Sequence, residues 1–300
     1  PKGDYVDWYV DELQQRGDHL SLAQAQNIRE YYGLDKPLIA QYWIWIWKLA
    51  HLDFGYGFEG EKPIKEIIRE RLPTTVALTG FTILLTWLFA IPVGIYSAVR
   101  QHTIGDYAFT FLGFAGLAVP DFLFGLVLMY IAFRYFETSV GGLFSGTYQY
   151  APWSWAKFVD MMEHLWIPAV VLGTSGTASL IRIMRNNLLD ELGKPYVVTA
   201  KAKGMSPVKL IVKYPVRVAI NPLISTVGYL LPALFSGSVI VSVVLSLPTL
   251  GPVLLTAMIQ EDVYTAGFII LMLGVLTVIG TLISDILLAV VDPRIKLTNR

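Results

Sequence analysis

The sequence predicts an all-α protein, a polytopic bundle of membrane-spanning helices. Of its 300 residues, 54% are hydrophobic and only 15% are charged, which is far from the composition of an average soluble domain. Five stretches are long enough to cross a bilayer, which takes about 20 apolar residues. Between two of these stretches lies a basic, polar island, residues 182–219, which belongs outside the lipid.

The composition and motifs exclude several classes of function. The formal net charge is zero, so no overall field favours a nucleic acid partner, and the absence of cysteine removes disulfides, thiol catalysis and thiolate metal sites. No serine stands in a nucleophile-elbow setting, so the chain is not expected to be an enzyme. We expect no metal site either, because the four histidines lack ligand spacing: His19, His51, His102 and His164.

Residues 1–73 form a polar N-terminal segment that is rich in Tyr and Trp. Asp7 to Tyr32 has a helix-like apolar pattern. Tyr42 to Trp47 has the sequence YWIWIW, which is too short to span and suits a membrane interface, where Trp and Tyr collect. Gly55 to Gly60 matches G-x-G-x-x-G, but no strand precedes it, so we expect no nucleotide site there.

The charges of the connections predict how the spans are oriented. The connections after the first and third spans and the C-terminal tail carry twelve Lys and Arg residues, whereas the two connections between them carry only Arg134 and Lys157. Positive residues accumulate on the cytoplasmic side, so the polar island and the C-terminus are expected there, with residues 1–73 external. The expected spans are Thr74 to Val99, Asp106 to Phe133, Leu165 to Met184, Ile220 to Leu247, and Tyr264 to Val291.

The polar island predicts two short helices joined at a glycine. Pro195 suits a first helical turn, so one helix is expected from Pro195 to Lys203, and Gly204 can supply the left-handed residue that ends it. Ser206 and Pro207 form an N-cap and first-position pair, which begins a second helix that runs to about Tyr214. The island would then be a compact, basic knob beside a membrane.

The stretch YVVTAKAKGMSPVKLIVKYPVRVAINP resembles the cytoplasmic coupling loop of permeases of ATP-binding-cassette (ABC) importers, in their oligopeptide/dipeptide branch. This chain departs from the family pattern at Val198, Tyr214 and Val218. GLDKPLIAQY with DFGYGF, and the C-terminal SDILLAVVDPRIKL, are also similar to the family, so the resemblance runs almost from end to end. Matching loop positions are Thr199, Ala200, Ala202, Lys203, Gly204, Arg217, Ala219 and Pro222.

The resemblance implies a type I ABC importer permease fold. It makes residues 1–73 the external segment after a first span that is missing from this chain, and 74–300 the permease domain, with its coupling loop at 182–219. The loop would contact an ATPase subunit through twelve residues: Thr199, Ala200, Lys201, Ala202, Lys203, Gly204, Met205, Ser206, Pro207, Val208, Ile211 and Arg217. Of the neighbouring apolar residues, Val208, Leu210, Ile211 and Val212 are expected to supply the buried contact with that subunit.

The implied partners are a second homologous permease subunit, two cytoplasmic ATPase subunits, an external solute-binding protein and membrane lipid, in a prokaryotic inner membrane. The chain contains no G-x-x-x-x-G-K-[ST] motif, so ATP and Mg would be bound by the ATPases and no cofactor by this chain. The implied cargo is a peptide, with oligosaccharides or nickel-type cargo as the alternative.

Six residues in or beside the spans are candidates for the pathway or a gate. An acidic side chain within a span, here Asp121, raises a functional hypothesis, although a neighbouring helix or partner could also satisfy it. Gly173 to Ser179 is a run of small residues, which suits either a path or close helix packing. Leu245 to Tyr264 suits either an external closure or a tight connector. The candidates are Asp121, Pro120, Ser175, Thr177, Pro248 and Gly251.

Two other functions compete with an importer subunit. An ion-coupled secondary transporter usually places several ionisable groups or broken-helix pairs at mid-membrane, whereas here chiefly Asp121 is found. A membrane anchor or receptor component would need neither a small-residue path nor an elaborate basic loop. Stoichiometric ATPase partners on purification would favour the importer.

Overall fold

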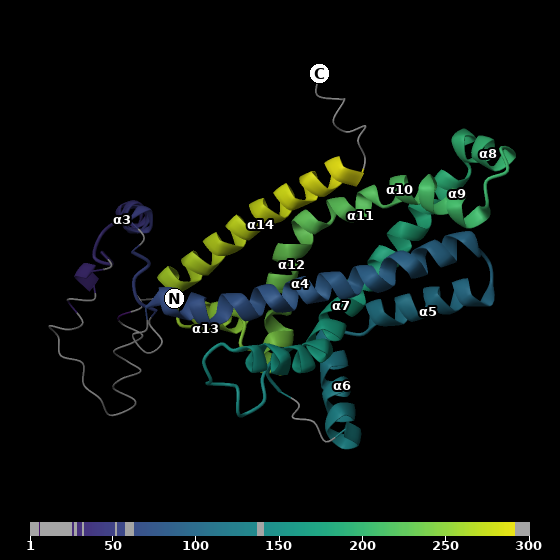
Figure 1. Ribbon diagram of the computed structural model, residues 1–300. Coiled ribbons are helices and arrows are strands. Elements are labelled where there is room, and N and C mark those ends of the chain that lie inside the picture. The colour runs from purple at the N-terminus through teal and green to yellow at the C-terminus, as the bar shows by residue number, and fades with distance from the viewer. Residues whose placement is uncertain are drawn as a thin grey trace. The chain divides into compact units, whose positions relative to one another are not determined.

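The computed structural model describes residues 33–51, 53–57, 63–136 and 141–291, together with residues 6, 26 and 29–31, apart from the side chains of 229 and 231–238. This part of the chain is helical and contains no β-strand (Figure 1). Most of Asp7 to Tyr32, and residues 58–60 of the segment Gly55 to Gly60, lie outside the described residues. The helices are α3 (Leu38–Ala50), α4 (Ile64–Val99), α5 (Ile104–Ala118), α6 (Asp121–Phe136), α7 (Trp155–Leu192), α8 (Pro195–Ala202), α9 (Pro207–Lys213), α10 (Pro215–Ala219), α11 (Asn221–Ser225), α12 (Val227–Val244), α13 (Leu250–Ile259) and α14 (Val263–Val291).

Three of the described helices are long and apolar enough to cross a membrane: α4, α7 and α14. The all-α, multi-span fold class predicted from the sequence is therefore confirmed. Two of these helices are longer than the spans predicted for them, since α4 begins at Ile64 rather than Thr74 and α7 runs from Trp155 to Leu192. The polar extensions continue the helix beyond the apolar stretch, which hydropathy alone does not detect.

The second predicted span, Asp106 to Phe133, is not one straight helix. It consists of α5 and α6, which meet at an angle of 103° across Val119 and Pro120, so the pair is either a broken span or a re-entrant loop. Val119 is extended, with φ −91° and ψ 126°, as is usual for a residue before proline. The predicted span therefore contains a sharp break at Pro120, because proline cannot continue the hydrogen bonding of a helix, while the apolar residues on both sides keep the hydropathy of the stretch high.

The fourth predicted span, Ile220 to Leu247, is also divided. Its first residues form the short α11, and α12 follows over 18 residues. Pro222 lies in the first turn of α11, a position that proline favours. The hydropathy of Ile220 to Leu247 as a whole predicted a span, whereas the break between α11 and α12 falls at the polar residues Ser225 and Thr226.

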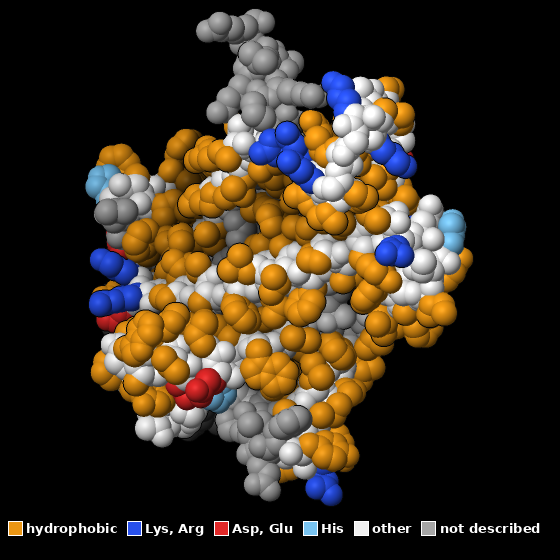
Figure 2. Space-filling model, turned by 45° about the vertical axis from the view of Figure 1, so that its right-hand side comes forward, with side chains coloured by type: hydrophobic (Ala, Val, Ile, Leu, Met, Phe, Trp, Pro, Cys, Tyr) orange, Lys and Arg blue, Asp and Glu red, His pale blue; other side chains and the backbone are white. Residues whose placement is uncertain are grey.

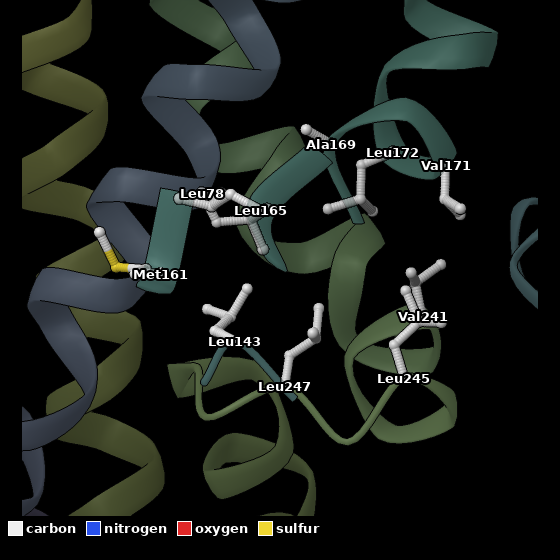
Figure 3. Packing of buried hydrophobic residues seen from close by; sticks show 10 residues of the cluster. All are labelled: Leu78, Leu143, Met161, Leu165, Ala169, Val171, Leu172, Val241, Leu245 and Leu247. Carbon is white, nitrogen blue, oxygen red and sulfur yellow. The ribbon is translucent and has the colours of Figure 1, made fainter. Parts of the chain in front are cut away.

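Contacts divide the chain into two compact units, one of residues 1–73 with 252–272, the other of 74–251 with 273–300. The second unit has a core in which α7 packs against α4, α12 and the connections that follow α6 and α12 (Figure 3). Fully buried side chains come from segments far apart in the sequence, such as Leu143, Leu165 and Val171. The whole cluster is Leu78, Leu143, Met161, Leu165, Ala169, Val171, Leu172, Val241, Leu245 and Leu247.

A further cluster in the same unit joins α4 and α7 to the short helices α10 and α11. It contains Ala90, Met184, Leu188, Ala219 and Leu223, all of them buried. The helices α4 and α7 approach closely at Gly94, where an added Cβ would lie 2.6 Å from the Cβ of Met184. A glycine at such a contact allows two helices to approach closely, as is common in helices that span membranes.

The other unit contains α3 and the first turns of α4 and α14. Its core consists of Ile64, Tyr264 and Phe268, all buried. Trp45 and Leu49 of α3 pack against these residues. The ring of Trp45 also lies beside Gly267, whose added Cβ would be 3.5 Å from it.

Candidate functional site

The polar island folds into the two short helices that its prolines and glycine predict. Pro195 lies in the first turn of α8, and Lys203 ends the helix as its C-cap. Gly204 follows with φ +78°, the left-handed conformation expected of it, and its N–H donates to the carbonyl of Lys201 at 3.0 Å. Pro207 begins α9, but the Ser206 hydroxyl forms no capping hydrogen bond in the structure. We call residues 195–214 the knob.

The knob has a small hydrophobic core of its own. Val197 and Ala200 of α8 are buried against Leu210 of α9, and Met205 and Ile211 pack around them. Ala200 therefore holds the two helices together rather than facing outward. Leu210, only 6% exposed, belongs to the same interior, so its predicted role in contact with another subunit was wrong.

The outer surface of the knob is formed by apolar and basic side chains together. Val208 is 75% exposed and Val212 58%, and both lie on α9. Most of the other predicted loop residues are exposed as well, whereas Met205 and Ile211 are partly buried. On the face in Figure 2, hydrophobic side chains predominate and Lys and Arg side chains gather towards the top, where α8 and α9 lie. The exposed members are Thr199, Lys201, Ala202, Lys203, Gly204, Ser206, Pro207, Val208 and Arg217.

The knob is held at both ends by helix α7 and its continuation. At its start, the hydroxyl of Tyr196 donates to Glu191, a residue of the last turns of α7. At its end, α10 packs on α7 through Ala219, and the side-chain amide of Asn187 donates to the carbonyl of Ala219 at 3.5 Å. Both ends of residues 195–219 are therefore attached to α7.

An ion pair that the sequence did not reveal links α7 to α5. Arg185 contacts Asp106 at 3.0 Å, and the side chain of Asp106 is only 3% exposed. Asp106 lies in the first turn of α5, and its N–H donates to the hydroxyl of the N-cap Thr103 at 3.4 Å. The T-x-x-D spacing signals only the start of α5, since an acidic residue is favoured in a first helical turn, and it does not indicate Arg185 as the partner.

The pathway candidates fall into two groups. In the first, Pro120 precedes Asp121 at the beginning of α6, and the hydroxyl of Ser175 on α7 donates to Asp121 at 3.5 Å. Thr177, on the same helix, is half-buried. Gly173 and Thr174, in the same small-residue run, pack closely against Thr86 and Gly116, so packing accounts for that part of the run.

The second group lies at the connection from α12 to α13. The carbonyl of Pro248 accepts a hydrogen bond from the hydroxyl of Thr74 at 2.6 Å, and Thr75 accepts one from the N–H of Leu250 at 3.0 Å. Gly251 approaches Val239 so closely that an added Cβ would lie 3.3 Å from its Cα. Among the described residues, no hydrogen bond joins this group to Asp121 or Ser175.

Comparison with known proteins places this arrangement in a family. The model of the family described as "Binding-protein-dependent transport system inner membrane component" matches residues 90–297, which include α5 to α14 and the whole knob. The chain belongs to this family. It is thus a permease subunit of an ABC importer, and the resemblance noted in the sequence is confirmed.

Relatives that match most of the chain are also named as transport system permease proteins. The oligopeptide transport system permease protein AppB of Bacillus subtilis is 35% identical over 278 residues, which cover 92% of this chain and 86% of AppB. The dipeptide transport system permease protein DppB of Escherichia coli K12 is 29% identical over 280 residues, covering 88% and 83%. The peptidoglycan transport system permease protein YejB of Agrobacterium fabrum is 30% identical over 282 residues, covering 92% and 76%.

Membership establishes a multi-pass membrane protein that works with an external binding protein and an ATPase.

Proposed function

We propose that this permease forms half of a peptide translocation pathway and is driven by ATPases that bind the knob. The proposal rests on the outer surface of the knob, where the exposed side chains of Val208 and Val212 lie among exposed lysines. A charge-only role at an anionic membrane surface would explain Lys201, Lys203 and Lys209, but it would not require exposed valines. An exposed apolar surface with a charged rim is typical of a protein interface.

The mechanism follows from how the knob is attached. Two cytoplasmic ATPases would bind ATP with Mg, close on each other, and carry two knobs together, one from this chain and one from a homologous second permease. Each knob would move its α7 through the contacts of Tyr196 and Asn187. Rigid-body movement of this kind can alternate a pathway between outward-open and inward-open states.

A peptide is the proposed cargo because AppB and DppB are named as oligopeptide and dipeptide permeases. Oligosaccharides and nickel-type cargo remain the alternative, since an external binding protein would make most of the selection. The linked pair Asp121 and Ser175 is the proposed pathway or gate element, and Pro248 with Gly251 the proposed external closure. The knob and the C-terminus are proposed to be cytoplasmic and residues 1–73 external.

Cross-linking tests the docking site directly, because the chain has no cysteine of its own. A Ser206→Cys variant, in membranes that contain the assembled transporter, is expected to cross-link to an ATPase subunit through a short bifunctional reagent. Gly146→Cys is the matched control, since Gly146 is exposed and lies in the connection between α6 and α7. Cross-linking of the control but not of Ser206→Cys would overturn the proposed orientation.

Reconstitution tests the cargo and the energy source. Proteoliposomes that contain the transporter and its binding protein are expected to accumulate labelled peptides only when ATP is supplied to the ATPases. Uptake of labelled oligosaccharides but not peptides would replace the cargo and retain the mechanism. Uptake driven by an ion gradient without ATP would instead identify a secondary transporter.

A further inference from the structure

Helix α3 has one face packed on protein and one face that is apolar and uncovered. The packed face consists of Trp45 and Leu49, which lie against the core of Ile64, Tyr264 and Phe268. Lys48 is held beside this face, where its ammonium group donates to the carbonyl of Tyr31 at 2.7 Å and lies 3.4 Å from the centre of the Tyr31 ring. The uncovered face consists of Leu38, Ile39, Tyr42, Trp43, Trp47 and Ala50.

The uncovered face is unusual for a surface exposed to water. Ile39 is 74% exposed, Trp43 64% and Trp47 69%, and none of the side chains on this face carries a charge. The residues recur every three to four positions, so they form a continuous strip along the helix. Large exposed apolar strips of this kind are usually covered by a membrane or by another protein.

The position of α3 favours a membrane over a protein partner. Its packed face contacts the first turns of α4 and α14, two helices that are long and apolar enough to cross a bilayer. Within the same unit, α14 exposes Ile270 and Leu271 soon after these contacts. The uncovered strip therefore belongs to the same unit as exposed apolar side chains of a helix that is long and apolar enough to cross a bilayer.

The length and composition of α3 specify how it would meet the membrane. Its 13 residues extend for about 20 Å, too short for a hydrocarbon core of about 30 Å. Trp and Tyr concentrate at the level of the lipid headgroups, and short amphipathic helices lie in that plane. A helix with two exposed Trp residues and one exposed Tyr on its uncovered face has the composition of such an interfacial segment.

We propose that α3 is an interfacial anchor that lies in the headgroup region of the bilayer and fixes the depth of the first turns of α4 and α14. The inference rests on family membership, which makes the protein a membrane component, and not on the proposed cargo. Lipid is the proposed occupant of the uncovered face of α3. A binding protein or a second permease on the same face would be a different result.

Spin labelling in lipid nanodiscs measures the depth of the strip. Single cysteines would replace Ile39, Trp43 or Trp47 in the assembled transporter, and each label would be tested for accessibility to oxygen, which concentrates in lipid, and to a water-soluble nickel chelate. Gly146→Cys, at an exposed position in the connection between α6 and α7, is the aqueous reference, and Leu282→Cys, at an exposed position of α14, is the lipid reference. A label at Leu49→Cys measures the accessibility of the packed face.

The proposal predicts oxygen-to-nickel accessibility ratios at all three strip positions that lie between the two references and several-fold above that of Gly146→Cys. Ratios equal to the aqueous reference would overturn it. Low accessibility to both reagents, as expected at position 49, would mean that a protein covers the strip and would also overturn it. The three strip labels sit on exposed positions, so these variants are expected to fold, and their assembly with the other subunits checks this independently.

Discussion

Arg185 and Asp106 form a two-point ion pair, in which Nε donates to one carboxylate oxygen and Nη2 to the other, each at 3.0 Å. The backbone N–H of His102 donates to the second oxygen at 3.0 Å. Asp106 thus accepts bonds from the connection before α5 and from α7. The pair fixes the beginning of α5 against α7, two residues before Asn187, which contacts α10.

Removal of the negative charge should destabilise this junction. In an Asp106→Asn variant, Arg185 would retain its charge in a largely buried setting without a compensating carboxylate, which costs about 3 kcal/mol. The expected result is a lower thermal unfolding midpoint of the purified transporter. Glu163→Gln is the control, because Glu163 is exposed on the same helix α7, and an equal shift in both variants would contradict the role of the pair.

The sequence allowed the knob to be predicted but not the ion pair, because the knob depends on neighbouring residues and the ion pair joins residues far apart in the sequence. Pro195, Gly204 and Pro207 act on their own backbone, so their effects can be predicted from neighbouring residues. Asp106 and Arg185 are separated by 79 positions, and no local pattern pairs them. The 103° bend at Val119 and Pro120 lies between these cases, since the proline was visible but the angle is set by what surrounds it.

The same limit explains the error at Leu210. Val208, Leu210 and Val212 are similar in hydropathy, and a seven-residue helix is too short for a clear apolar period. Only packing against Val197 and Ala200 distinguishes the buried side chain from the exposed ones.

Two glycines of α4 should respond differently to the same substitution. Gly94→Ala would place a methyl group 2.6 Å from the Cβ of Met184, and overpacking of this kind costs roughly 1–3 kcal/mol. Gly80→Ala meets nothing within 4 Å and should be neutral or stabilising by up to about 1 kcal/mol, from helix propensity. Thermal unfolding of both variants in detergent measures the difference. Equal stability would mean that α4 and α7 are not closely packed at Gly94.

Val208 and Leu210 should separate docking from folding of the knob. Val208→Asp alters an exposed position, so the thermal midpoint should change little, whereas recovery of ATPase subunits with the purified permease should fall. Leu210→Ala removes buried contacts with Val197 and Ala200 and should cost about 2–5 kcal/mol of local stability. Protease cleavage within the knob would report this loss. Unchanged ATPase recovery in Val208→Asp would contradict docking at this face.

Gly204 provides the sharpest test of coupling, because its surroundings in this chain are empty. A Cβ added there meets nothing within 4 Å, so a larger side chain would be opposed only by the left-handed backbone, at roughly 1–2 kcal/mol, and by a docked partner. Gly204→Val should therefore retain membrane insertion but lose ATP-driven transport. Gly204→Asn should retain more activity, because Asn tolerates this conformation better than a β-branched residue.

Gly193→Val is the matched control for this series, since Gly193 also has open space around it but a negative φ of −83°. Transport and ATP hydrolysis measured on the same proteoliposomes distinguish uncoupling from loss of the complex. Uncoupling leaves hydrolysis in place while transport falls. Wild-type transport by Gly204→Val would show that the left-handed turn at Gly204 has no part in the mechanism. Equal losses of transport in Gly204→Val and Gly193→Val would assign the effect to added bulk near the helices rather than to this turn.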